Sequence, residues 1–152
     1  MRFLYPAILS LVITTAATAS LVYMDTAQLA DESTLVVVGE IESIESFYGD
    51  DGYIYSRAYV DVEHFVLGDG TNGVVEVIYP GGIVGDIGMT TSISPDFEEG
   101  MDVLLFLKNN DEGEFVLANH AGSKFTIEDG VVVEIGISLG DYMNEINAAA
   151  NR

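Results

Sequence analysis

The hydrophobic positions beyond residue 33 follow the pattern of β-strands. The segment 34–47, TLVVVGEIESIESF, opens with a continuous apolar run and then alternates between apolar and acidic residues. The segment 53–68, YIYSRAYVDVEHFVLG, alternates with period two through Ala58, Val60 and Val62. Such alternation is typical of strands with one buried face. The sequence GDDG between the two segments is a turn signal, so they are predicted to be successive strands.

Shorter apolar runs separated by turn signals continue this pattern to residue 135. The turn signals are GDGTNG at 68–73, NNDEGE at 109–114 and EDG at 128–130. Strands joined by tight turns at this spacing favour an antiparallel barrel or a sandwich. The predicted short strands are VVEVIY (74–79), DVLLFLK (102–108), FVLA (115–118), KFTI (124–127) and VVVEI (131–135).

The last segment, 138–150, changes to a helical period. Its apolar residues fall on one helical face, and Ser138 with Asp141 three residues later is a capping signal. The predicted fold is therefore mostly β, a small antiparallel barrel of about seven strands with a C-terminal amphipathic helix. The apolar face consists of Leu139, Tyr142, Met143, Ile146 and Ala149.

The N-terminal segment has the pattern of an export signal. Arg2 is followed by no charge until Asp25, and Ala17-Thr18-Ala19 satisfies the small-x-small rule for cleavage. We expect a signal peptide at 1–19, with an uncleaved anchor extending to about residue 24 as the alternative. Either reading predicts a secreted or cell-envelope location for the remaining chain.

Residues 20–32 form a short lead-in segment, and residues 33–152 are predicted to be a single β-barrel domain. Within the lead-in, the stretch TAQLADES is expected to form a short helix that leads into the barrel. The alternative is that the segment after the cleavage site lends a strand to a neighbouring copy, which would make the protein a subunit of a surface filament.

The charge balance excludes several classes of partner. Twenty-five Asp and Glu face five Lys and Arg, and the formal net charge is −20. Binding to DNA or RNA requires Lys and Arg at the phosphates, so we expect no nucleic-acid partner. Anionic lipid surfaces are disfavoured for the same reason, which leaves membrane contact only through an uncleaved N-terminal segment. Cationic partners, metal cations and high-salt surroundings are compatible with this charge.

The chain has no cysteine. Its absence excludes disulfides, thiol catalysis and cysteine-ligated metal sites. An exported domain of this size must then depend for stability on its core, on a cation or on a partner subunit.

The order of five motifs resembles a widespread group of secreted bacterial and archaeal domains. The motifs are LVVVGEI, AYVDVEHFVLGDG, VEVIYPGGIVGDIG, SPDFEEGMDVLLFL and HAGSKFTIEDGVV, and they cover roughly residues 33–135. The resemblance implies a small β-barrel of the OB type, distantly similar in layout to netrin and metalloproteinase-inhibitor barrels. It supplies no catalytic residue. The residues that match the pattern, which we read as fold residues, are Gly81, Gly82, Pro95, Phe97, Gly100 and Phe106.

Protease inhibition of the metalloproteinase-inhibitor kind is not expected. The inhibitor relatives begin with a cysteine that coordinates the metal of the protease, and this chain has no cysteine.

The stretch YPGGIVGDIG, 79–88, resembles the start of a phosphate-binding loop because glycines follow an apolar run. A phosphate loop needs a following helix N-terminus and usually a lysine. Here MTTSISPDF follows, and no lysine occurs before Lys108. We therefore expect the glycines to provide bends and positive φ at a barrel corner. The exposed loop, through Gly81, Gly82 and Asp86, could still contact a partner.

The hairpin FYGDDGYIYSRAY concentrates aromatic residues. Tyrosine is enriched at recognition surfaces, so Phe47, Tyr48 and Tyr53 are predicted to belong to a binding surface. Tyr55 and Tyr59 are expected to lie in the core.

His64 and His120 are the two histidines. His64 shares strand parity with Val60 and Val62, so it is expected to point inward or to sit at the barrel end. For both, a packed or hydrogen-bonded role is favoured over a metal ligand.

The oxygen-rich turns are candidate calcium sites. GDDG contains Asp50 and Asp51, and GDGTNG contains Asp69, Thr71 and Asn72. Neither is an EF-hand, since position 80 is proline where a bidentate glutamate is required. Calcium binding is the only cofactor hypothesis, and solvated turns are the alternative.

These observations favour an exported, non-enzymatic module that acts in binding or assembly at the cell surface. A protein partner or self-association is expected. The filament subunit is one alternative. The other is a secreted hydrolase that uses an acid pair or a cation, which would require His64 and carboxylates to converge in a pocket.

Overall fold

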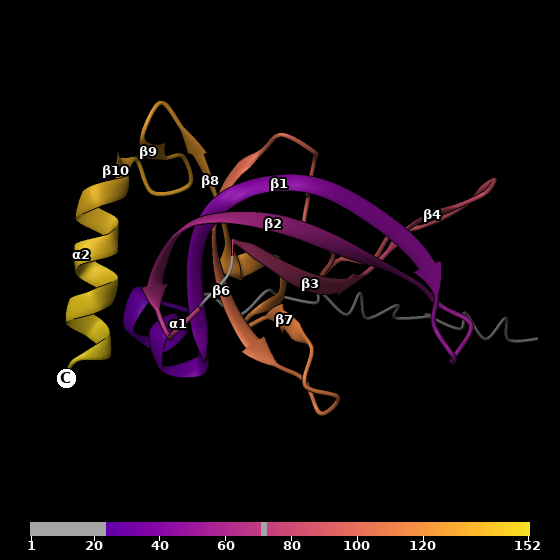
Figure 1. Cartoon of the computed structure of the whole chain (residues 1–152), viewed down its shortest axis with the longest axis horizontal. Helices are drawn as coiled ribbons and strands as arrows, with labels where there is room; N and C mark the ends of the chain where they lie inside the picture. The colour runs from indigo at the N-terminus through magenta and orange to yellow at the C-terminus, as the bar shows by residue number, and fades with distance from the viewer. Residues whose placement is uncertain (1–23, 71–72) are drawn as a thin grey trace, which may run out of the picture.

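The computed structural model describes residues 24–70 and 73–152, which form a mostly β structure with a C-terminal helix (Figure 1). Helix α2 lies on one side of the sheet, and β4 projects on the opposite side. The elements are α1 (Thr26–Glu32), β1 (Leu35–Tyr48), β2 (Ile54–Leu67), β3 (Val74–Pro80), β4 (Gly82–Val84), β5 (Ile87–Met89), β6 (Asp102–Asn109), β7 (Phe115–Leu117), the 3-10 helix η1 (His120–Ser123), β8 (Lys124–Glu128), β9 (Val131–Val132), β10 (Ile137–Ser138) and α2 (Leu139–Ala150).

The β1–β2 hairpin is the longest pair of strands in the sheet. Its antiparallel pairing runs from Val36 opposite Leu67 to Tyr48 opposite Ile54. The register shifts at three places, and such bulges bend a strand and increase its twist. Figure 1 shows the resulting strong curvature of β1.

Within the described residues, eight strands form one sheet in the order β1-β2-β3-β7-β6-β8-β9-β10, with an additional pairing between β1 and β6. The β1–β6 pairing bends the sheet back on itself. The junction between β3 and β7, however, consists of one parallel residue pair, Val77 with Phe115. The sheet is therefore not closed as a regular barrel, and it has more strands than the seven expected.

Proline explains why the β3–β7 junction is so short. The Gly81 N–H donates to the Ile54 carbonyl at 2.9 Å. In the antiparallel pairing of β3 with β2, every second residue of β3 directs its backbone N–H and C=O toward β2, and this bond identifies which residues these are. Ile78 and Pro80 consequently direct their backbone groups away from β2, toward the side of β7. Pro80 has no N–H, so the β3–β7 ladder lacks a donor there and stops.

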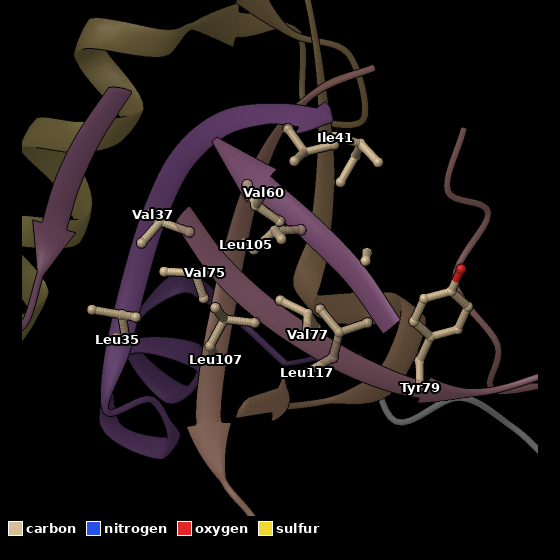
Figure 2. Packing of buried hydrophobic residues seen from close by; sticks show 12 residues of the cluster. Leu35, Val37, Ile41, Val60, Val75, Val77, Tyr79, Leu105, Leu107 and Leu117 are labelled. Carbon is tan, nitrogen blue, oxygen red and sulfur yellow. The ribbon is translucent and has the colours of Figure 1, made fainter. Parts of the chain in front are cut away.

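One hydrophobic core lies between the two curved halves of the sheet. Every second residue of β1, β2, β3 and β6 contributes to it, as the alternating burial of these strands requires. Tyr79 lies at one end of this cluster (Figure 2). The buried members are Leu35, Val37, Ile41, Ala58, Val60, Val75, Val77, Tyr79, Val103, Leu105, Leu107 and Leu117.

A second core lies on the other face of β1 and β6, beneath the helices. It explains why β1 begins with an unbroken apolar run, because Leu35 to Gly39 are buried on both faces. Phe106, Phe125 and Tyr142 meet edge to face there, with ring centroids 5.3–6.3 Å apart. The buried members are Leu29, Val36, Val38, Leu104, Phe106, Ala118, Phe125, Val132, Tyr142 and Ile146.

Both helices begin at the residues that their sequences predict. The Ser138 hydroxyl accepts from the Asp141 N–H at 3.1 Å, which confirms the capping signal of α2. Asp25 and Gln28 form a reciprocal capping box at α1, so the stretch TAQLADES is helical as expected. The signal peptide predicted at 1–19 lies outside the described part of the chain, as does the alternative anchor up to residue 23. In the described ranges, none of the helices has the length and apolar character needed to cross a membrane.

The glycine-rich stretch after β3 forms a small projecting ribbon, β4 and β5, that the sequence analysis did not predict. Gly81 and Gly82 have φ of 102° and 135°, in agreement with the expected positive-φ bend. The Ser56 hydroxyl donates to the Gly81 carbonyl at 2.7 Å and lies 2.8 Å from the Ser46 hydroxyl. A Cβ at Gly82 would overlap both serine hydroxyls, so glycine is required there.

Candidate binding groove

A groove with a volume of about 840 Å³ lies beside the short β3–β7 junction. One wall is the β1–β2 hairpin around its turn at 49–53, and the other is the turn between β6 and β7 at 110–114. The end of β3 and the loop at 93–95 also line it. The groove thus occupies the place where Pro80 ends the sheet ladder.

The floor of the groove is apolar. Tyr79, 8% exposed, packs edge-on against Phe97 with ring centroids 5.2 Å apart, and burial raises its pKa above 10.0. Its hydroxyl therefore stays protonated at neutral pH. The other apolar residues that line the groove include Ile78, Pro80, Ile93, Pro95, Val116 and Leu117.

One rim of the groove is organised by Asp51. Its carboxylate accepts the Tyr53 N–H at 3.0 Å and the Tyr55 hydroxyl at 2.8 Å. The Tyr53 N–H and then the Tyr55 hydroxyl lower the pKa of Asp51, and Asp51 in turn raises the pKa of Tyr55. A carboxyl whose pKa is lowered is poorly suited to act as a general acid near neutral pH.

The opposite rim is held by Asn110. Its side-chain oxygen accepts from the Glu112 and Glu114 N–H groups at 3.0 and 2.9 Å. Its amide nitrogen donates to the Glu114 carboxylate at 3.2 Å. This bonding confirms the turn predicted from NNDEGE and holds its backbone together with the Glu114 carboxylate.

The ionisable residues of the groove are mostly acidic. Five carboxylates line it, against one lysine and one histidine. The two turns supply the acidic residues, and the basic residues come from β6 and η1. The acidic residues are Asp50, Asp51, Asp111, Glu112 and Glu114, and the two basic residues are Lys108 and His120.

Only part of the predicted binding surface lines the groove. Phe47 and Tyr48 line the groove, with Arg57 5.2 Å above the Phe47 ring. Tyr53 is 62% exposed, in agreement with the prediction, but it lies outside the groove lining. The remaining predicted contacts are Gly81 before β4, Gly82 at the start of β4 and Asp86 in the β4–β5 turn, and they do not line the groove either.

Tyr55 and Tyr59 are half-buried and belong to neither core, which corrects the expectation that they are core residues. Helix α2 covers the second core, not this strand face. Tyr55 therefore remains available to the groove, and the Tyr59 hydroxyl donates to Glu45 at 3.2 Å.

The two predicted calcium turns are far apart. Asp50 and Asp51 precede the first residue of β2 and Asp69 follows its last residue, at opposite ends of a 14-residue strand. Such a strand is about 45 Å long when fully extended, so one ion cannot bridge both turns. Asn72 and Thr71 lie outside the described residues. Over 24–70 and 73–152, no three His, Asp or Glu side chains converge as a metal site.

The expectation that His64 points inward is wrong. The pairing opposite Val38 and Gly39 skips Glu63, and this bulge changes the parity of the strand, so that His64 is exposed. His120 is also exposed, at a φ of 48°. The hydrolase hypothesis requires carboxylates close to His64. Asp51 does not satisfy this requirement, because His64 and Asp51 lie at opposite ends of β2.

The sequence analysis missed the floor of the groove. Ile78, Ile93 and Val116 come from three separate segments, and their meeting depends on the non-local β3–β7 junction. The one local signal was Pro80, because a proline at the end of a strand marks a place where a ladder stops.

No protein-family model matches the chain, and a search of curated proteins finds no match.

Proposed function

We propose that this protein is an exported, non-enzymatic binding module that holds a segment of a partner protein in the groove beside the β3–β7 junction. The observation that carries the proposal is the combination of an apolar floor with two turns that are held by hydrogen bonds of Asp51 and Asn110. Concave sites with an apolar lining and a few placed polar groups are typical of binding sites.

An OB-like architecture is part of the proposal. Pairings join β1 to β2, β2 to β3, β3 to β7, β7 to β6 and β6 to β1. This is the cyclic order of a partly open five-stranded barrel. In OB folds the ligand lies on the face of the second and third strands, between the loop after the first strand and the loop before the last. The corresponding loops here, 49–53 and 110–114, are the two walls of the groove. This support is by analogy of fold.

The experiment that tests the binding role is selection of a displayed random-peptide library against the full chain. Ile93→Ser removes an apolar side chain from the floor without touching either core. Ile83→Ser is the matched control, because Ile83 is 71% exposed on β4, away from the groove. We expect selected peptides to lose binding to Ile93→Ser and to keep it to Ile83→Ser. If no peptide shows this difference, the groove is not a binding site.

A further inference from the structure

We infer that the groove takes an extended, positively charged segment of a partner protein, an inference that rests on the binding role proposed above. The segment would place apolar side chains on the floor and lysine or arginine side chains against the two acidic turns. Three features support this ligand: negative charges on both walls, their lack of internal partners and an apolar floor between them.

The acidic residues come from both walls of the groove. Asp50 and Asp51 belong to the hairpin turn, and Asp111, Glu112 and Glu114 belong to the β6–β7 turn. Each wall therefore offers carboxylates to a ligand lying between them. Carboxylates on both walls would attract a positively charged partner and set its register in the groove.

Most of this charge is not neutralised within the protein. In the described part of the chain, the one ion pair formed by a lysine or arginine joins Arg57 to Glu76 at 3.3 Å, and Lys108 forms none. The carboxylates of Asp50, Asp111 and Glu112 accept no hydrogen bond from residues 24–70 or 73–152. They are therefore free to bind cationic groups of a ligand.

The two acidic turns face the same groove, because Asp51 of the hairpin turn and Glu112 of the β6–β7 turn both line it. The hydrogen bond from Tyr55 to Asp51 is the largest cause of the raised pKa of Tyr55, and the charge of Glu112 also contributes to it. Coulombic interaction falls with distance and is screened over about 10 Å in salt. The negative potential is thus shared across the groove.

An extended peptide can contact the apolar floor and the acidic walls at the same time. Alternate side chains of an extended peptide point in opposite directions, so one set can contact Ile78, Ile93 and Val116 while the other reaches the carboxylates. A nucleic acid or an anionic lipid is repelled by the same carboxylates. The ligand class with both required properties is a basic, partly apolar polypeptide segment.

The test measures binding of fluorescein-labelled peptides to the full chain by fluorescence anisotropy, at low ionic strength and in high salt. One peptide alternates valine with arginine, and two matched peptides alternate valine with glutamate and serine with arginine. We expect binding of the valine–arginine peptide, weakened by salt, with weaker binding of the serine–arginine peptide and none of the valine–glutamate peptide.

Two double variants separate a local site from general attraction to an acidic protein. Asp111→Asn with Glu112→Gln removes two charges from the groove, and Glu128→Gln with Glu145→Gln removes two exposed charges from β8 and α2. We expect the groove pair to raise the Kd about fivefold and the control pair to raise it less than about twofold. Equal effects of the two pairs, or no binding of the valine–arginine peptide, would overturn the inference.

The outcome also distinguishes this inference from the proposed function. If library peptides sensitive to Ile93→Ser are selected but they are neutral or acidic, the groove binds and the cationic class is wrong. If no peptide is sensitive to Ile93→Ser, the binding role itself fails.

Discussion

The Tyr55 hydroxyl donates a 2.8 Å hydrogen bond to the Asp51 carboxylate across the turn of the β1–β2 hairpin. The same carboxylate also accepts the Tyr53 N–H at 3.0 Å. These two bonds hold the Asp51 carboxylate and the Tyr55 ring together at the rim of the groove. The first prediction follows from their opposite effects on the two titrating groups.

The pKa of Asp51 is expected to lie below its ordinary value of 3.8, with the Tyr53 N–H as the larger cause and the Tyr55 hydroxyl as the smaller. Because the folded pKa is lowered, the stabilisation is present above the unfolded pKa and is lost as the pH falls through the folded pKa. Tyr55→Phe should raise the pKa of Asp51 only partway to its ordinary value. Carboxyl NMR titration measures this, and a full return to the ordinary value would contradict the assigned order of causes.

Gly39→Ala is expected to destabilise the protein strongly. A Cβ at Gly39 would overlap the backbone carbonyl of Asp61, which cannot move without displacing β2. We expect a loss of about 3 kcal/mol or more in the free energy of unfolding, measured by urea denaturation.

Gly140→Ala is the matched control, because nothing lies within 4 Å of the new methyl group in α2. It should stabilise the protein by about 0.5 kcal/mol, since alanine is the better helix former. A similar loss of stability in both variants would show that the close approach at Gly39 is not what requires glycine.

Ile146→Ala tests whether α2 is part of the fold. Ile146 is fully buried in the second core, so truncation should lower the free energy of unfolding by about 2–5 kcal/mol. The neighbouring Glu145 is exposed, and Glu145→Ala should change it by less than about 0.5 kcal/mol. An Ile146→Ala chain as stable as the parent would mean that α2 does not cover this core in solution.

Ser56→Ala should loosen the β4–β5 ribbon. Ser56 is buried and bonds both the Gly81 carbonyl and the Ser46 hydroxyl, and Ser46 accepts the Ile83 N–H at 3.2 Å. Leaving these groups unpaired should lower the free energy of unfolding by about 1–3 kcal/mol. Hydrogen exchange at the Ile83 amide should speed up, whereas the exposed Ser92→Ala should leave it unchanged.

The strands and helices with a clear local pattern could be predicted from the sequence. Alternation placed Ala58 and Val60 inside, and the Ser138 capping signal placed α2. The parity argument failed at His64, because a bulge depends on the partner strand and leaves no local signal. The expectation that Tyr55 lies in the core was wrong for a different reason, since which helix covers which strand face is decided by tertiary packing.

The candidate site could be predicted only in part. Phe47 and Tyr48 were assigned to a binding surface because aromatic residues are concentrated in one short segment, whereas Asp50 and Asp51 were predicted only as a calcium turn. The second wall at 110–114 was predicted as a turn but not as a site. Its role depends on the β3–β7 junction, a contact between segments about forty residues apart in sequence.

Amide chemical-shift mapping of the full chain with the valine–arginine peptide would locate the bound peptide on the protein. We expect the largest shifts at 47–55 and at 108–116, on both walls of the groove, with smaller shifts at α2 and the β4–β5 ribbon. Shifts that are largest outside the groove, or that are spread evenly over the acidic surface, would show that the groove is not the binding site.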